Sequence, residues 1–211
     1  MELSSTKANI IDAALTLFSE YGYEAVSVAQ IAEAIGIKAP SLYKHFKSKR
    51  DIFEAIRKEM DERYLQKTSA MQMDGTDPSL DFTIFRHVSE GMLVDMGKSL
   101  FLYFLNDDYV KRFRKMMTIE QFSNQNLSQL YATQYVDDPL NYQGMMLGML
   151  AQNGLLKQED VRIMALHFYA PLYLLLTVCD RQPQREEEAL QLLEQHIKQF
   201  NRLYLRKEES L

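Results

Sequence analysis

Hydrophobic side chains recur every three or four residues along most of the chain, the spacing that puts them on one face of an α-helix. Near the N-terminus, Ile31 and Ile35 lie one turn apart, and Leu42 and Phe46 repeat that spacing. We find no convincing pair of strands with alternating polarity. The pattern predicts an all-α fold, with later helices over residues 49–73, 79–96, 99–106, 108–133, 139–153, 158–181 and 184–206.

Two short helices and a tight turn are predicted between Ser27 and Phe46. Ser27 followed three residues later by Gln30 has the pattern of a capping box, which satisfies free backbone N–H groups at a helix start. Gly36 can adopt the positive φ that a helix end requires. Pro40 fits the first turn of a second helix of about two turns, because its missing N–H costs no hydrogen bond there. The segment is a helix-turn-helix candidate whose second helix suits the major groove of DNA.

The second helix of this motif has one apolar and one polar face. At about 100° per residue, Leu42 and Phe46 share the buried face. The opposite face carries Pro40 and Lys44, flanked by Ser41 and Tyr43. These four side chains are candidates for contact with DNA. From the residues alone, two alternatives stay open: a helical hairpin whose polar face only meets water, and a Tyr43 ring that belongs to the core.

Charge is distributed unevenly in a way that favours the DNA interpretation. The whole chain has a formal net charge of −5. Residues 36–50 nevertheless hold no acidic side chain and five basic ones, which are Lys38, Lys44, Lys47, Lys49 and Arg50. A basic edge on an acidic protein suits local contact with phosphates. Ser48 and Asp51 form a further capping pattern, which places Lys49 and Arg50 at a helix N-terminus where phosphate is favoured.

Several motifs between Lys7 and Ile56 occur together in one known family. The end of the first helix carries Ala14, Leu17, Phe18, Gly22 and Tyr23. Ile31, Ala32 and Gly36 follow, and then Leu42, Tyr43, His45 and Phe46, with Ser48 and Lys49 directly after them. This run resembles the DNA-binding domain of TetR-family transcriptional regulators. One departure is Lys38, where many relatives have a capping Ser or Thr.

The resemblance assigns roles to individual side chains. Positions that often contact phosphates are occupied by Ser27, Tyr43, His45 and Lys49. Positions near base edges are occupied by Lys38, Ala39, Pro40 and Ser41. Lys44 joins this set from the helical wheel alone. His45 has an alternative role as a neutral partner inside the hairpin.

The resemblance also implies a two-domain organisation, with a helix-turn-helix domain over residues 1–56 and a helical effector-binding and dimerisation domain over residues 57–211. It implies a homodimer formed by the last two helices, which acts on a near-palindromic operator of double-stranded DNA. The expected function is transcriptional regulation, usually repression that a small-molecule effector relieves. An activator, or a helical protein that binds small molecules without DNA, is the alternative.

Methionine and aromatic residues in the middle helices are candidates for lining an apolar effector pocket, since thioethers repack at small cost. The candidates are Met92, Met96, Phe101, Phe104, Met116, Met117, Glu120, Phe122, Met145 and Met149. Within this set, Glu120 is a possible partner for a cationic effector. Each of these side chains is also ordinary core material, and a solvated glutamate is the alternative for Glu120.

Other classes of function find little support in the sequence. The four histidines are scattered, without an HExxH or CxxC pattern for a metal, and no glycine-rich phosphate loop or GxSxG motif occurs. We therefore expect neither an enzyme nor a cofactor. No signal-peptide pattern is found and uninterrupted apolar runs are short, which predicts a cytoplasmic protein without a membrane partner. The single Cys179 excludes an internal disulfide.

Overall fold

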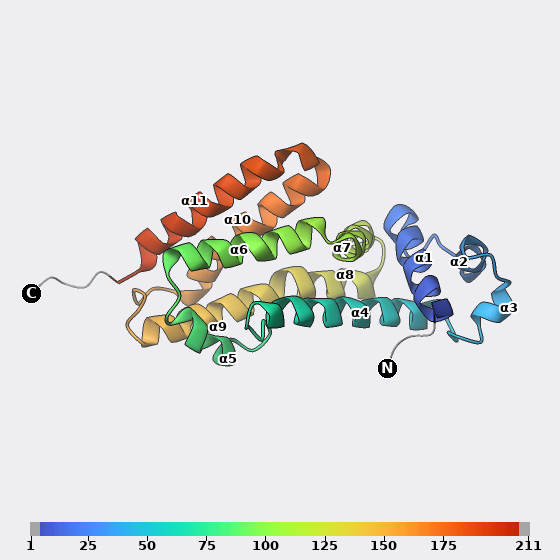
Figure 1. Cartoon of the computed structure of the whole chain (residues 1–211), viewed down its shortest axis with the longest axis horizontal. Coiled ribbons are helices and arrows are strands. Elements are labelled where there is room, and N and C mark those ends of the chain that lie inside the picture. The colour runs from blue at the N-terminus through green and yellow to red at the C-terminus, as the bar shows by residue number, and fades with distance from the viewer. Residues whose placement is uncertain (1–4, 207–211) are drawn as a thin grey trace, which may run out of the picture. The chain divides into compact units, whose positions relative to one another are not determined.

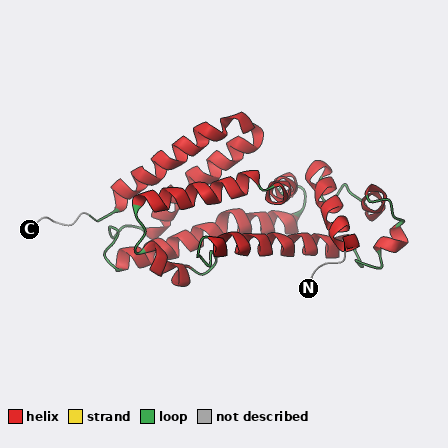
Figure 2. Cartoon of the chain, viewed as in Figure 1, coloured by secondary structure: helices red, strands yellow, loops and turns green. Residues whose placement is uncertain are grey.

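The apolar repeats of the sequence fold as helices in the computed structural model, which describes residues 5–206 (Figures 1 and 2). The α-helices are α1 (Ser5–Tyr21), α2 (Val28–Ala34), α3 (Ala39–Leu42), α4 (Lys49–Ala70), α5 (Pro78–Phe85), α6 (Glu90–Asn106), α7 (Asp108–Glu120), α8 (Gln125–Ala132), α9 (Asp138–Gln152), α10 (Val161–Arg181) and α11 (Glu186–Tyr204). A π-helical turn, Thr133–Asp137, joins α8 to α9, and a 3₁₀ turn, Pro183–Arg185, precedes α11. Strand-like pairing within residues 5–206 is limited to one isolated bridge between Leu156 and Leu205. The all-α prediction is confirmed.

Three of the predicted helices have wrong boundaries, because polar side chains start new helices at other positions. Residues 79–96 and 99–106 do not form the two predicted helices, since α5 ends at Phe85 and α6 runs unbroken from Glu90 to Asn106. The Ser89 hydroxyl accepts the Met92 N–H at 3.3 Å and so caps the start of α6. The predicted helix 108–133 is likewise divided into α7 and α8, because the Asn124 side chain accepts the Leu127 N–H at 3.0 Å.

The described chain divides by its packing into two units. Unit 1 comprises residues 5–64 and 107–132, and unit 2 comprises residues 65–106 and 133–206. This division differs from the predicted boundary at residue 56, because α7 and α8 pack with the N-terminal helices. The first four and last five residues of the predicted domains lie outside the described residues.

Within unit 1, α7 is attached to both α1 and α4. The Arg112 guanidinium donates hydrogen bonds of 2.8 Å to the Asp12 carboxylate and to the Thr16 hydroxyl of α1. The Tyr109 hydroxyl donates to the Ile56 carbonyl of α4 at 3.0 Å. Burial raises the pKa of this tyrosine well above its usual range, so the hydroxyl stays protonated and able to donate. The contacts make α7 an integral part of the unit that contains the helix-turn-helix.

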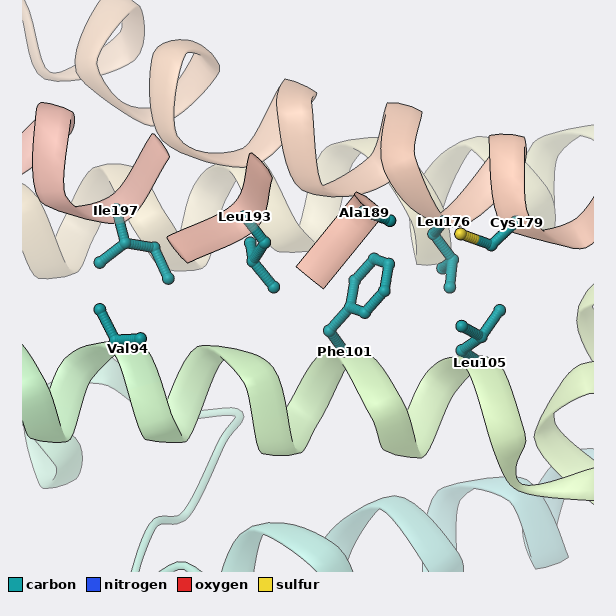
Figure 3. Packing of buried hydrophobic residues seen from close by; sticks show 8 residues of the cluster. All are labelled: Val94, Phe101, Leu105, Leu176, Cys179, Ala189, Leu193 and Ile197. Atoms are coloured by element: carbon teal, nitrogen blue, oxygen red, sulfur yellow. The ribbon is translucent and has the colours of Figure 1, made fainter. Parts of the chain in front are cut away.

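Unit 2 contains a core built by α6, α10 and α11. Figure 3 shows the α6 side chains facing those of the other two helices. The cluster consists of Val94, Phe101, Leu105, Leu176, Cys179, Ala189, Leu193 and Ile197, each at most 8% exposed. Gly97 lets α6 approach α11 closely, since a Cβ at this position would lie 2.7 Å from the Ile197 Cδ1 atom. A second buried cluster joins α9 and α10 to Phe200 of α11.

Helix α10 is unusually apolar for its degree of burial. By length and composition it is long enough to cross a membrane, with a mean hydropathy of 1.5 over its most apolar window, although short uninterrupted runs predicted no such helix. Single polar residues such as His167 interrupt the apolar runs, but the mean hydropathy of the helix stays high. Only 17% of that window is buried inside the protein, whereas a core helix would be mostly buried. Much of its apolar surface is therefore available for a further partner.

Candidate nucleic-acid interface and effector site

The capping box predicted at Ser27 is present at the start of α2. The Gln30 backbone N–H donates to the Ser27 hydroxyl at 3.3 Å, and the Ser27 N–H donates to the Gln30 side-chain oxygen at 2.8 Å. Ile31 and Ala32 of the same helix are buried. The start of α2 is thus fixed by local hydrogen bonds, and Ser27 stays exposed beside it.

The turn after α2 depends on Gly36, whose φ is +69°. The Ile37 N–H donates to the Ala32 carbonyl at 2.9 Å and the Gly36 N–H to the Glu33 carbonyl at 3.0 Å. These two bonds form a Schellman cap, which needs a residue in the left-handed region. The predicted turn is confirmed, and it directs the chain into α3.

The second helix of the motif is shorter than predicted. It was expected to run about two turns to Phe46, but α3 ends at Leu42 and the chain continues through turns. The His45 N–H still reaches the Leu42 carbonyl at 2.9 Å, while the Lys47 N–H donates at 3.0 Å to the Asp51 carboxylate of α4 instead. The start of α4 therefore accepts the backbone N–H of Lys47, which a longer α3 would have bonded within the helix.

The predicted apolar and polar faces of this segment are both present. Leu42 and Phe46 are buried. On the other side, Lys38, Pro40 and Lys44 are exposed, and the Tyr43 side chain is 52% exposed, so the alternative of a core tyrosine is wrong. Ala39, Ser41 and His45 are half-buried. The exposed side chains form what we call the α3 face, defined by Lys38, Pro40, Tyr43 and Lys44.

Basic side chains continue beyond the α3 face to the start of α4. Lys47 is exposed, and the Arg50 side chain is 78% exposed with its Nε atom 3.8 Å from the Glu54 carboxylate. An exposed pair at that distance contributes little stability, and it leaves the guanidinium accessible to a stronger anion. The predicted helix start is confirmed, because the Ser48 hydroxyl accepts the Asp51 N–H at 3.1 Å.

Lys49 differs from the other basic residues in the structure. Its ammonium group donates to the backbone carbonyls of Tyr23 at 2.8 Å, Val26 at 3.0 Å and Glu24 at 3.3 Å. It also lies 4.4 Å from the centroid of the Tyr23 ring. Because a lysine has three N–H donors, all of them are used inside the protein. In this structure Lys49 holds the loop between α1 and α2, and its predicted phosphate contact stays a prediction.

Comparisons with known proteins also indicate a DNA-binding domain in the N-terminal part of the chain. Residues 10–56 match the model of the family described as bacterial regulatory proteins, tetR family. The chain is 31% identical over 125 residues to the negative transcriptional regulator IcaR of the biofilm operon icaADBC from Staphylococcus aureus strain Newman. The match covers 59% of this chain and 61% of IcaR. It is 42% identical over 60 residues to the repressor ComR of Escherichia coli K12, which covers 28% of this chain and 29% of ComR.

Solved structures share the fold over nearly the whole length. A putative TetR-family regulator from Mesorhizobium loti superposes with a TM-score of 0.68 at 19% identity, covering 97% of this chain and 100% of that one. A complex of SmeT with triclosan gives a TM-score of 0.67 at 20% identity, covering 97% and 93%. Residues 10–56 form a domain of the TetR family of bacterial regulatory proteins. Beyond that domain, the solved structures share the helical fold of the C-terminal part.

The ten effector candidates do not share one environment. Met116, Met117 and Glu120 are buried in unit 1, whereas Phe101 is part of the unit 2 core in Figure 3. Phe122 is 90% exposed. Met92 is exposed on α6, while Met96 and Phe104 of the same helix are half-buried. Spacing along the sequence did not reveal these differences in burial, and the predicted effector role of the set stays a prediction.

Two of the candidates, Met145 and Met149, line a groove between α9 and α10 with a volume of about 680 Å³. Leu140, Val161 and Ala165 add further apolar side chains. Polar groups of Asp137, Asn141, Gln152 and Arg162 also line the groove. Gly144 and Gly148 widen it, since neither position has a side chain. Its apolar lining with a few polar groups is the usual composition of a small-molecule site.

Proposed function

We propose that this protein is a sequence-specific, DNA-binding transcriptional repressor of the TetR family, which a small-molecule effector releases from its operator. The observation that carries the proposal is the exposed α3 face, which continues into an acid-free basic edge on an otherwise acidic chain. IcaR is described as a negative regulator and ComR as a repressor. We infer a cytoplasmic protein that is not an enzyme, in keeping with a role on DNA.

Within the α3 face we assign base contacts to Lys38, Pro40 and Lys44, together with the half-buried Ala39 and Ser41. Apolar groups such as the Pro40 ring fit a thymine methyl, and lysines can reach the acceptors of guanine. Ser27, Tyr43 and His45 are assigned to phosphates, which set the register of the protein on the duplex. Lys49 is left out of the DNA-contacting set because its donors are used internally.

The protein is proposed to act as a homodimer. One short recognition segment reads few bases, and a two-fold dimer presents two of them to successive major grooves about 34 Å apart. Helix α10 is incompletely buried within one subunit, which supports an interface in which α10 and α11 pack against a second copy of the chain. Exposed apolar side chains on these two helices include Ile163, Leu166, Leu174, Leu192 and Leu203. A near-palindromic operator follows from the two-fold symmetry.

We assign the effector to the groove between α9 and α10, and we expect a small, largely apolar molecule. Among the structural neighbours, SmeT is in complex with triclosan, and FrrA is described as a flavonoid-responsive regulator. The effector must bind the DNA-free form more tightly than the DNA-bound form, and linkage then weakens DNA binding by the same factor. A coupling of about 1–3 kcal/mol gives roughly 5–150-fold release.

DNA binding is tested directly by fluorescence anisotropy of the full-length protein against duplexes tiled across the DNA that flanks its own gene. We expect saturable binding of two subunits per site that resists random competitor DNA. Lys44→Ala should weaken binding to this site about tenfold, which corresponds to the loss of one good base contact. The matched control is Lys58→Ala on α4, whose side chain is 79% exposed and pairs with Glu62, and it should change affinity less than twofold. Binding to every duplex alike, or equal losses in both variants, would contradict the proposal.

The effector groove is tested by Gly148→Leu. A Cβ at Gly148 would meet the Val161 Cγ1 atom at 3.6 Å, an ordinary contact, so a leucine fills the groove without an initial clash. We expect a compound found in a screen that includes triclosan and flavonoids to bind about tenfold more weakly, a loss of about 1.4 kcal/mol. Gly91→Leu on α6, where nothing lies within 4 Å of the added Cβ, is the control for placing leucine in a helix. Equal binding by all three proteins, measured calorimetrically, would place the effector elsewhere.

A further inference from the structure

Glu120, at the C-terminal end of α7, is a charged residue with only 2% of its surface exposed. One carboxylate oxygen, Oε1, accepts the backbone N–H of Glu24 at 3.2 Å. The other, Oε2, is buried and has no hydrogen-bond partner within the part of the chain that the structure describes. A buried carboxylate with a single long hydrogen bond costs stability, and an apolar side chain of similar size would cost less. Stability therefore does not explain this residue.

The backbone around Gly22 is shaped to admit the carboxylate. Gly22 has a φ of +87°, and a Cβ built on it would lie 2.7 Å from the Glu120 Oε1 atom. Any other residue at this position would both strain the backbone and displace Glu120. The close approach thus depends on a glycine at the end of α1, and it brings the carboxylate directly onto the loop that leads into α2.

This loop, residues 22–26, is held from two sides. Glu120 accepts the backbone N–H of Glu24. The Lys49 ammonium donates hydrogen bonds to the carbonyl oxygens of Tyr23, Glu24 and Val26. The side-chain amide of Asn124 adds a hydrogen bond to the Glu24 carboxylate. We call Glu120, Lys49 and Asn124 the loop clamp. All three side chains and the loop belong to unit 1.

The clamped loop ends directly before Ser27, the N-cap of α2. The conformation of the loop orients the start of α2, and the Gly36 turn connects α2 to α3. Lys49 lies within the matched domain, residues 10–56, but Glu120 and Asn124 do not. The loop before the DNA-binding motif is thus held in part by side chains at and just after the end of α7, about a hundred residues further along the chain.

We propose that Glu120 is a positioning residue for DNA binding. It orients the α1–α2 loop, and so α2 and α3, by accepting the Glu24 N–H, and it touches no DNA itself. This role rests on the proposed function of the α3 face. In some proteins a buried polar group lowers stability but specifies one defined geometry.

The experiment uses the full-length protein and its operator duplex, with Glu120→Met and Glu120→Gln as a matched pair. Methionine keeps the size and removes the acceptor, whereas glutamine keeps an oxygen that can accept the Glu24 N–H. We expect Glu120→Met to bind the operator about tenfold more weakly at an unchanged or higher Tm, and Glu120→Gln to bind within about threefold of the original protein. Amide hydrogen exchange at Glu24 should be faster in the methionine variant and near the original rate in the glutamine variant.

The possible outcomes separate this inference from the proposed function. Failure of the unsubstituted protein to bind any duplex would overturn the proposed function, and the positioning role with it. If the unsubstituted protein binds and Glu120→Met binds equally well, only the positioning role is overturned, whatever the exchange rate. Unchanged exchange at Glu24 overturns it too. Should Glu120→Met not fold, Glu120→Asp replaces it, because a side chain shorter by one methylene keeps the charge but withdraws the acceptor from Glu24.

Discussion

Replacing Lys49 with methionine is expected to lower the free energy of unfolding by about 3 kcal/mol, near the upper range for charged hydrogen bonds. The ammonium is the shared donor for three carbonyl groups of the α1–α2 loop, and its loss leaves them without that partner. The packing of the lysine over the Tyr23 ring would be altered as well. Chemical denaturation monitored by circular dichroism measures the change, with the midpoint shift read at constant slope.

The control for this substitution is Lys47→Met, since Lys47 is exposed two residues away and no side-chain hydrogen bond holds it in the described structure. We expect this variant to change stability by less than about 0.5 kcal/mol. The salt dependence of DNA binding is measured for both variants, since the loss of one phosphate contact flattens its slope by about one unit per subunit. A Lys49→Met protein that is as stable as the original but binds DNA with a weaker salt dependence would contradict this prediction. Lys49 would then be assigned to a phosphate contact.

Local chemistry made much of the N-terminal motif predictable from the sequence. The Ser27 cap, the Gly36 turn and the Ser48 cap each depend on residues within five positions of one another, so their hydrogen bonds follow from the pattern itself. The same kind of signal is present at Ser89 and Asn124, where caps start α6 and α8 inside stretches predicted as continuous helix. Gly97 lies between the helices predicted over residues 79–96 and 99–106, but in the structure it is inside α6 and allows close helix packing.

Contacts between distant segments could not be predicted in this way. Lys49 looked like a phosphate ligand because it stands in a basic run, and only the folded chain brings the Tyr23 carbonyl to its ammonium group. Glu120 appeared as a possible partner of a cationic effector because methionines precede it, whereas its partner is the backbone of Glu24. The different burial of the effector candidates was unpredictable for the same reason: helical spacing reveals which residues share a face, but not which helix that face meets.

Dimerisation gives the second large expected effect. In the double variant Leu174→Glu and Leu192→Glu, two carboxylates are placed on the proposed interface of each subunit, where α10 and α11 border a groove of about 350 Å³. The two leucines are 61% and 42% exposed within one subunit, so the subunit itself should fold normally. Burying the introduced charges against a second copy is costly, and the dimer should separate. Light scattering should then report the 24.6 kDa mass of a single chain.

Loss of the dimer should reduce operator affinity far more than any single contact does. Two linked recognition segments bind one site with a gain of about 100-fold or more over a single segment, because the second contact becomes intramolecular. We therefore expect the double variant to lose about that factor in affinity. Leu80→Glu on α5, at a side chain 64% exposed, adds a charge elsewhere in unit 2 and should leave both mass and affinity unchanged. A double variant that remains dimeric would mean that another surface joins the subunits and that the apolar face of α10 has a different partner.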